Sequence, residues 1–155
     1  MSLLNYYKLC DDNENGELYF HILRSDRCLS YGDNREVVPG REMKARRVTS
    51  HREGVFDGNP ILCSYGMHAS INIQDAVKCK RLESGVWICL VRLNTKVVHG
   101  NDKSVALRRK VVAMRQLKRG DLKRIIHAGE FNTTASYNCL FIRWITENPW
   151  TPSND

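Results

Sequence analysis

The hydrophobic and polar positions along the chain predict several short strands. Residues 18–23 are rich in aromatic and branched side chains, which is typical of a strand. Residues 86–93 are mostly apolar at both alternating sets of positions, as in a central strand that is covered on both faces. Residues 136–145 are similarly apolar, and we expect a third, buried strand there.

Other segments predict helices and loops. Asn72 can cap a helix in which the apolar residues that follow are spaced by three and four positions. Residues 116–128 also predict a helix, while residues 104–114 favour a strand because of their β-branched side chains. Residues 11–16 are Asp, Asn, Glu and Gly, and they predict a connecting loop.

The fold class expected from these elements is α+β. The chain has 155 residues, no internal repeat and no long linker, so one domain is sufficient. A chain of this length buries roughly two thirds of its unfolded surface and needs no disulfides or metal. We predict a single domain over residues 1–148, with a mixed or antiparallel sheet and a few short helices, and a flexible tail over residues 149–155.

Composition narrows the possible environments. Apolar residues make up 42% of the chain and charged residues 26%, which is ordinary for a globular protein. There is no signal-peptide pattern and no apolar run of about 20 residues, so we expect a cytoplasmic protein without a membrane partner. The six cysteines lack a compact spacing, and we interpret them as reduced thiols.

The chain is basic, with a formal charge of +7. Its densest group of cations is offset by Asp121 alone over the same interval. The members of this basic cluster are Arg108, Arg109, Lys110, Arg115, Lys118, Arg119, Lys123 and Arg124. Such a cluster could follow a phosphate backbone, or it could be a solvated surface with no partner. No Walker loop, zinc finger or RNA-recognition motif accompanies it.

A candidate ligand site lies around Gly66. Glycine tolerates a positive φ and lets a ligand approach the backbone, and here it is followed by the polar side chains of His68 and Ser70. Histidine titrates near neutral pH, which makes His68 a candidate acid, base or ligand contact. A histidine on a strand can also be merely hydrogen-bonded. We expect no metal site, because CxxC and HxxxH spacings are missing.

Several short motifs resemble a family of small, mostly uncharacterised bacteriophage proteins. These motifs are Tyr31-Gly32-Asp33, Arg35-Glu36-Val37-Val38, Leu62-Cys63, Gly66-Met67-His68-Ala69-Ser70, Asp75-Ala76, Val91 and Asp102-Lys103. The resemblance covers about residues 19–110 and implies a phage accessory protein in an infected bacterial host. It implies no established activity.

A second resemblance is to ADP-ribosyltransferases of the poly-ADP-ribose polymerase type. It rests on residues 66–70, on Asp75-Ala76 and on the strand at residues 88–93. It implies that His68 lies near the stacking aromatic, that Ser70 is the motif serine, and that His21 or His51 binds ribose. The family's catalytic glutamate is missing, because Cys139 stands at the matching position of residues 137–142. Glu130 or Glu147 could replace it only if the strand register were shifted.

These observations lead to three functional hypotheses. The first is a phage-encoded host-takeover or anti-defence protein that binds a nucleotide-type ligand, such as NAD or ADP-ribose, or a host or defence-system protein. The second is an NAD-dependent ADP-ribosyltransferase with a displaced glutamate, and the third is a basic nucleic-acid-binding module. The predicted ligand-binding residues are His21, Gly66, His68, Ser70 and Tyr137.

Overall fold

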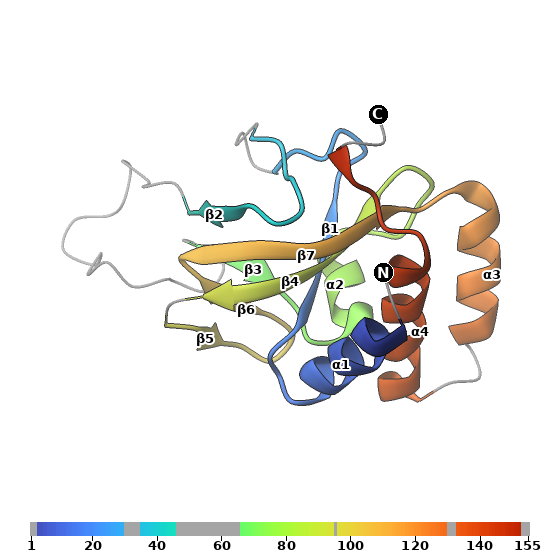
Figure 1. The fold of residues 1–155 in the computed structure, drawn as a ribbon, viewed down its shortest axis with the longest axis horizontal. Coiled ribbons are helices and arrows are strands. Elements are labelled where there is room, and N and C mark those ends of the chain that lie inside the picture. The colour runs from blue at the N-terminus through green and yellow to red at the C-terminus, as the bar shows by residue number, and fades with distance from the viewer. Residues whose placement is uncertain (1–2, 30–34, 46–65, 95, 130–132, 153–155) are drawn as a thin grey trace.

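The computed structural model describes residues 3–29, 35–45, 66–94, 96–129 and 133–152. In this part of the chain the helices are α1 (Leu3–Glu14), α2 (Ile73–Cys79), α3 (Arg119–Gly129) and α4 (Thr134–Glu147). The strands are β1 (Tyr19–Leu23), β2 (Glu42–Lys44), β3 (Met67–Ala69), β4 (Trp87–Asn94), β5 (Val98–His99), β6 (Ser104–Ala106) and β7 (Arg108–Gln116). Helices α1, α3 and α4 lie together at one end of the molecule (Figure 1). The prediction of an α+β fold is confirmed.

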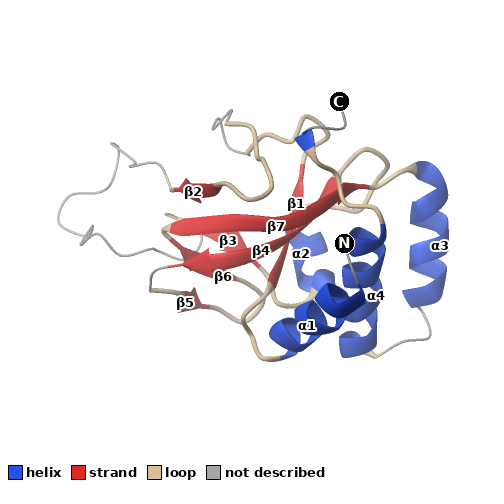
Figure 2. Cartoon of the chain, viewed as in Figure 1, coloured by secondary structure: helices blue, strands red, loops and turns tan. Residues whose placement is uncertain are grey.

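The strands form two antiparallel sheets (Figure 2). The larger has the order β1-β4-β7-β2 and the smaller has the order β3-β6-β5. An isolated bridge between Phe20 of β1 and Ser70 after β3 joins the two sheets, with N···O distances of 2.6 and 2.9 Å. The edge strand of the larger sheet therefore lies against the edge strand of the smaller one.

Alternation along β1 and β4 sends apolar side chains to both faces of the larger sheet. On one face, which we call the helix-covered face, Phe20, Ile22, Ile88 and Leu90 pack with residues of α1, α2 and α4. Buried side chains of the helices, including the fully buried Phe141, also pack on this face. The helices and this face of the larger sheet therefore share one hydrophobic core.

The opposite face, which we call the pocket face, packs against the smaller sheet and the segment that precedes β2. Tyr19, Leu23, Trp87 and Cys89 are buried there. They pack with Met67 and Ala69 of β3, with Leu29 and with Val37. His21 lies between Tyr19 and Leu23 on β1, so the same alternation places its side chain on the pocket face.

The buried strand expected at residues 136–145 is wrong, because this segment belongs to helix α4. Its buried side chains include Tyr137, Phe141 and Ile145, which are spaced by four residues and share one side of the helix. Thr133 caps the helix by accepting a hydrogen bond from the backbone N–H of Ser136 at 3.2 Å. The apolar residues that suggested a strand covered on both faces therefore form the buried side of helix α4.

The loop expected at residues 11–16 is also wrong for most of its length, because α1 continues to Glu14. Polar residues at its end are held by partners from distant segments. Asp12 pairs with Arg92 at 2.7 Å, and Asn13 donates hydrogen bonds to the carbonyl oxygens of Leu18 and Ile71 at 2.9 Å. The turn begins at Asn15, and Gly16 within it has a φ of 76°.

Two smaller differences concern the other predicted elements. Residues 104–114 contribute to two strands, β6 and β7, which belong to different sheets. Asn72 precedes α2 as expected, but its side chain does not cap the helix. Asn138 of α4 accepts the hydrogen bond from the N–H of Ile73 at 2.9 Å instead. The helix expected at residues 116–128 is present as α3, which begins at Arg119.

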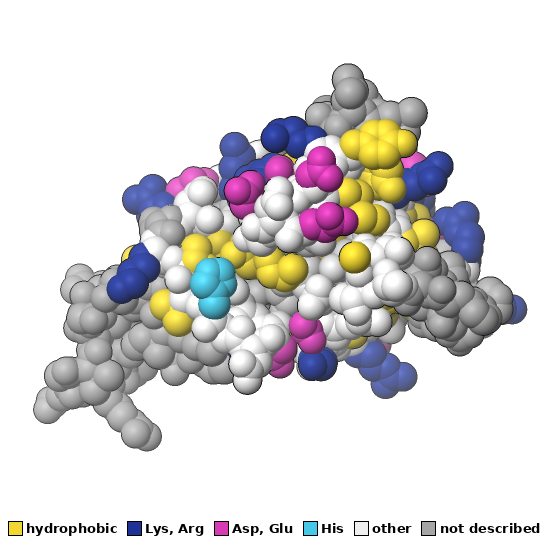
Figure 3. All heavy atoms as spheres, turned by 90° about the horizontal axis from the view of Figure 1, so that it is seen from below, with side chains coloured by type: hydrophobic (Ala, Val, Ile, Leu, Met, Phe, Trp, Pro, Cys, Tyr) yellow, Lys and Arg dark blue, Asp and Glu magenta, His cyan; other side chains and the backbone are white. Residues whose placement is uncertain are grey.

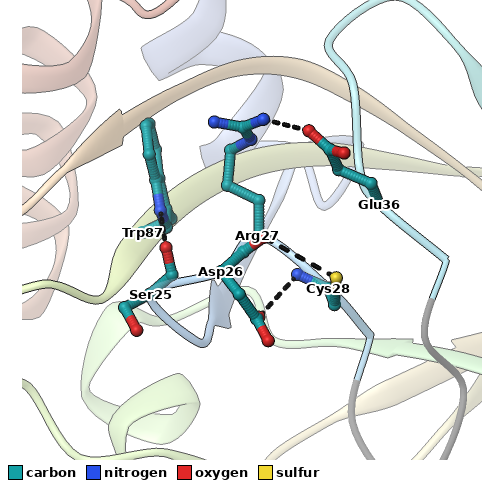
Figure 4. A network of polar contacts seen from close by, with 6 residues as sticks. All are labelled: Ser25, Asp26, Arg27, Cys28, Glu36 and Trp87. Carbon is teal, nitrogen blue, oxygen red and sulfur yellow. Dashed lines mark hydrogen bonds and ion pairs between the residues drawn. The ribbon is translucent and has the colours of Figure 1, made fainter.

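Trp150, which the sequence places in a flexible tail, packs against the pocket face. Its backbone N–H donates to the carbonyl oxygen of Met114 at 2.8 Å, and the centre of its ring lies 5.5 Å from that of Trp87. The guanidinium of Arg27 lies 4.0 Å from the Trp150 ring centre. It also pairs with Glu36, as Figure 4 shows. Cation–π contacts of this kind favour a fixed arrangement. Trp150 is therefore part of the packed fold.

None of the helices in the described residues is both long enough and apolar enough to cross a lipid bilayer.

Candidate functional site

A cavity of about 370 Å³ opens where the edge of β1 meets β3. Its volume lies within the range of roughly 300–1,000 Å³ that is common for small-molecule sites. Four of the predicted ligand-binding residues line it, namely His21, Gly66, His68 and Ser70. The remaining described lining residues are Phe20, Ile22, Leu29, Met67, Ala69, Ala76, Cys79, Lys103 and Arg109. The cavity thus combines an apolar wall with a group of basic side chains.

Local backbone geometry places the lip of the cavity. Gly66 has a φ of 128°, a conformation that side chains rarely adopt, so glycine is favoured there. Met67 and Ala69 of β3 turn into the core, which leaves His68 between them on the other side of the strand. The predicted turn, strand and pocket lip are therefore present at residues 66–70.

Ser70 has a positioning contact. Its hydroxyl donates a hydrogen bond to the carbonyl oxygen of Asp102 at 2.7 Å. Asp102 lies in the turn between β5 and β6 and is followed by Lys103, which lines the cavity. Ser70 therefore ties the Lys103 segment to the lip, and its oxygen can still accept a hydrogen bond from a ligand.

Arg109 is the lining residue whose role the sequence did not predict. It was expected at the surface with the basic cluster, yet it is only 3% exposed. Its Nη1 donates to the carbonyl oxygen of His68 at 2.9 Å, across the gap between the two sheets. The spacing of Arg109 and Val111 could have predicted its burial. The two residues are two positions apart, so on a strand they face the same side, and Val111 is buried.

Burial and neighbouring charges perturb the titration of this site. Burial, followed by the charges of Arg109 and His68, holds the pKa of the His21 imidazole well below its usual value of 6.5. Burial, followed by the charges of Lys103 and Arg109, lowers the pKa of His68. Burial also lowers the pKa of Arg109 to about 10, so this side chain remains charged at neutral pH. Both imidazoles are consequently neutral beside a permanent positive charge.

Tyr137 does not belong to this cavity. It lies on α4 in the core of the helix-covered face, with its ring 5.0 Å from that of Phe141. Its placement in the ligand site was based on a strand at residues 136–145, and the helix removes that basis. Cys139 is on the same helix, so it does not occupy a last core strand.

The cavity has no carboxylate among its described lining residues. Glu147, one of the two possible replacements for the missing glutamate, is on α4 and pairs with Arg143 at 3.2 Å. The other, Glu130, lies outside the described residues, as do His51 and the motif residues Tyr31, Gly32, Asp33, Leu62 and Cys63. Transfer chemistry that needs a carboxylate near His68 therefore has no candidate within the described part of the chain.

The basic cluster does not form one surface. Arg109 is buried, Arg108 pairs with Glu42 at 3.3 Å, and Arg115 lies 4.5 Å from the Trp144 ring centre. Lys110 is exposed on β7. The exposed cations around α3 are Lys118, Arg119, Lys123 and Arg124. On the face shown in Figure 3, acidic side chains lie near the middle and most cations lie at the margins. Within the α3 group, Arg124 pairs with Asp121 at 3.2 Å.

No group of three or more His, Cys, Asp or Glu side chains in the described residues could hold a metal ion.

Taken together, the fold and the cavity define a small α+β protein with a basic pocket of ligand size between two antiparallel sheets. Comparisons with protein-family models, with curated proteins and with solved structures give no match. The resemblances to phage accessory proteins and to ADP-ribosyltransferases therefore stay predictions from the sequence.

Proposed function

We propose that the protein binds a nucleotide-type ligand in the cavity between β1 and β3, and that this binding serves a phage-encoded host-takeover or anti-defence role. One observation carries the proposal. His21 is 45 residues before Gly66 in the sequence, yet both line one cavity together with His68 and Ser70. The apolar wall suits a base or nicotinamide ring, and the basic side chains suit phosphate.

The binding hypothesis is favoured over transferase activity. A bound nucleotide needs only the apolar wall and the cations that line the cavity. Transfer of ADP-ribose also needs a group that stabilises the ribosyl cation, and the described lining residues include no carboxylate. Nucleotide binding therefore needs only groups that line the cavity, whereas transfer needs an additional carboxylate.

The test is thermal unfolding of the purified protein with NAD, ADP-ribose and cyclic dinucleotides. A ligand at about 100 times its dissociation constant adds ~2.7 kcal/mol to the free energy of unfolding. For a chain of this size that corresponds to an increase in Tm of roughly 5–10 °C. We expect such a shift with at least one ligand, and we expect His68→Ala to reduce it.

His99→Ala is the matched control, because His99 is an exposed histidine on β5 that does not line the cavity. The control variant should keep the full shift. An equal shift in His68→Ala and the wild type would place the ligand elsewhere. If no ligand changes Tm, the nucleotide hypothesis fails and a host or defence-system protein becomes the expected partner.

A further inference from the structure

Arg109 carries a buried positive charge that no described residue lining the cavity balances. Its side chain is 3% exposed, and its Nη2 has no hydrogen-bond acceptor among the described residues. Burying a cation without a counter-charge is costly, and arginine is almost never fully buried unless it is paired. An arginine in this state, lining a cavity, indicates that something other than the described chain balances its charge.

The surroundings of Arg109 increase this imbalance. Lys103 lines the same cavity, and Arg35 is close enough to act on Arg109 electrostatically. Cys89 also lies nearby, but burial keeps its thiol neutral by raising its pKa to about 12. The described lining residues include no Asp or Glu. The local charge is therefore positive and comes from several separate segments of the chain.

We propose that Arg109 is the anchor for an oxyanion of the pocket ligand, a phosphate or a carboxylate, and that this anion supplies the missing counter-charge. Nη1 stays on the carbonyl oxygen of His68, which holds one end of the guanidinium in place and leaves Nη2 for the anion. Lys103 lies on the same cavity as a second cation for the anion. This inference deepens the proposed function, because it names the ligand group that the cavity recognises.

The contacts also set an order of importance among the basic residues. Arginine matches phosphate and carboxylate through parallel N–H groups, whereas lysine acts as a point charge. Removal of Arg109 should therefore weaken anion binding by about 10- to 100-fold. Lys103 should contribute less, because it is partly exposed to solvent.

The experiment compares wild type, Arg109→Met and the matched control Arg108→Met. Arg108 is on the same strand but pairs with Glu42 outside the cavity. Tm is measured with inorganic phosphate, acetate, ADP-ribose and uncharged adenosine, at ionic strength matched with sodium chloride. Phosphate and ADP-ribose should raise Tm of the wild type and of Arg108→Met, but not of Arg109→Met. The acetate arm shows whether a carboxylate is sufficient.

The outcomes separate this inference from the proposed function. A phosphate shift that persists in Arg109→Met overturns the anchor and indicates the α3 surface instead. Equal shifts with adenosine and ADP-ribose in the wild type also overturn the anchor, while binding in the cavity stands. A chain that responds to none of the four compounds overturns the anchor, whereas the nucleotide-binding function fails only if NAD and the cyclic dinucleotides also leave Tm unchanged.

A second measurement applies even if Arg109→Met does not fold. The ring protons of His21 and His68 are titrated by NMR in the wild type, with and without phosphate. Among the described residues, the other titratable or charged groups around the cavity are Cys79 of α2, Cys89 of β4, Lys103, Arg109 and Arg35 beside it. An anion on Arg109 should raise the pKa of both imidazoles, and unchanged values would overturn the anchor.

Discussion

The two faces of the larger sheet bury different chemistry. On the helix-covered face, buried amides are satisfied by protein partners, as with Asn13 and Asn138. On the pocket face, the buried guanidinium of Arg109 has one nitrogen without a described acceptor and lies beside two histidines. On the helix-covered face the neutral indole Nε1 of Trp144 also lacks an acceptor among the described residues. The difference between the two faces is therefore one of charge, because the group that lacks an acceptor on the pocket face is a cation.

This difference separates stability from binding. Apolar side chains that are fully buried, such as Phe141, stabilise the fold by leaving water and by close packing. An uncompensated charge acts in the opposite direction, because it lost its hydration without gaining a counter-charge. We therefore expect substitutions on the helix-covered face to change the free energy of unfolding, and substitutions in the cavity to change mainly ligand affinity.

The largest expected effect is that of Phe141→Ala. Phe141 is fully buried between Tyr137 and Trp144, and its truncation leaves a cavity. Such truncations lower the free energy of unfolding by about 3–5 kcal/mol. Urea denaturation should show a lower midpoint, while ligand affinity of the folded protein should be unchanged. Tyr7→Ala, at a side chain that is 63% exposed, is the control and should change stability by less than about 0.5 kcal/mol.

A smaller effect is expected from Asn138→Ala. Asn138 caps α2 through Ile73 and donates a hydrogen bond to Asn72 at 3.0 Å. The variant leaves a buried N–H unsatisfied, which costs about 1–3 kcal/mol. The measurement is the urea midpoint, compared with Asn101→Ala in an exposed turn. Because α2 contributes Ala76 and Cys79 to the cavity, weaker ligand binding in Asn138→Ala would show that the two faces are coupled.

The smallest effect is the pH dependence of stability from the cavity histidines. The pKa of both His21 and His68 is lowered in the folded state from 6.5. The unfolded chain then binds protons before the folded chain does, so the free energy of unfolding falls as pH decreases below about 6.5. Above that value this contribution is constant and fully present.

Thermal unfolding between pH 5 and 8 measures this contribution. His21→Gln should reduce the loss of Tm at acidic pH, because glutamine does not titrate. His99→Gln is the control, since His99 is exposed and outside the cavity. An unchanged acid slope in His21→Gln would mean that other groups dominate the acid sensitivity of the fold.

Much of the pocket face could be predicted because its signals are local. Gly66 and the alternation of residues 67–70 predict a turn and a strand without reference to distant residues. Residues 18–23 and 86–93 are short and rich in branched or aromatic side chains, and β1 and β4 are found there. His21 entered the ligand site only through a resemblance, and its place in the cavity depends on the pairing of the two sheets.

The helix-covered face was predicted less well because its elements depend on partners far away in the sequence. The polar end of α1 is stabilised by the ion pair of Asp12 with Arg92. It is also stabilised by the hydrogen bonds of Asn13 to the carbonyl oxygens of Leu18 and Ile71. The apolar run of α4 fits a strand or a helix equally by composition, and Thr133 was the local signal that favoured a helix. The burial of Arg109 could not be read from a stretch that contains mostly cations.

The bridge between Phe20 and Ser70 has a dynamic consequence. It is an isolated bridge between the edges of two sheets, and it lies at the rim of the cavity. Parting of these two hydrogen bonds would widen the entrance without disturbing the long pairing of β4 with β7. The backbone amides of Phe20 and Ser70 should therefore exchange with deuterium through a local opening, at lower free energy than global unfolding. A bound ligand that spans β1 and β3 would slow the exchange of these two amides more than that of any other amide.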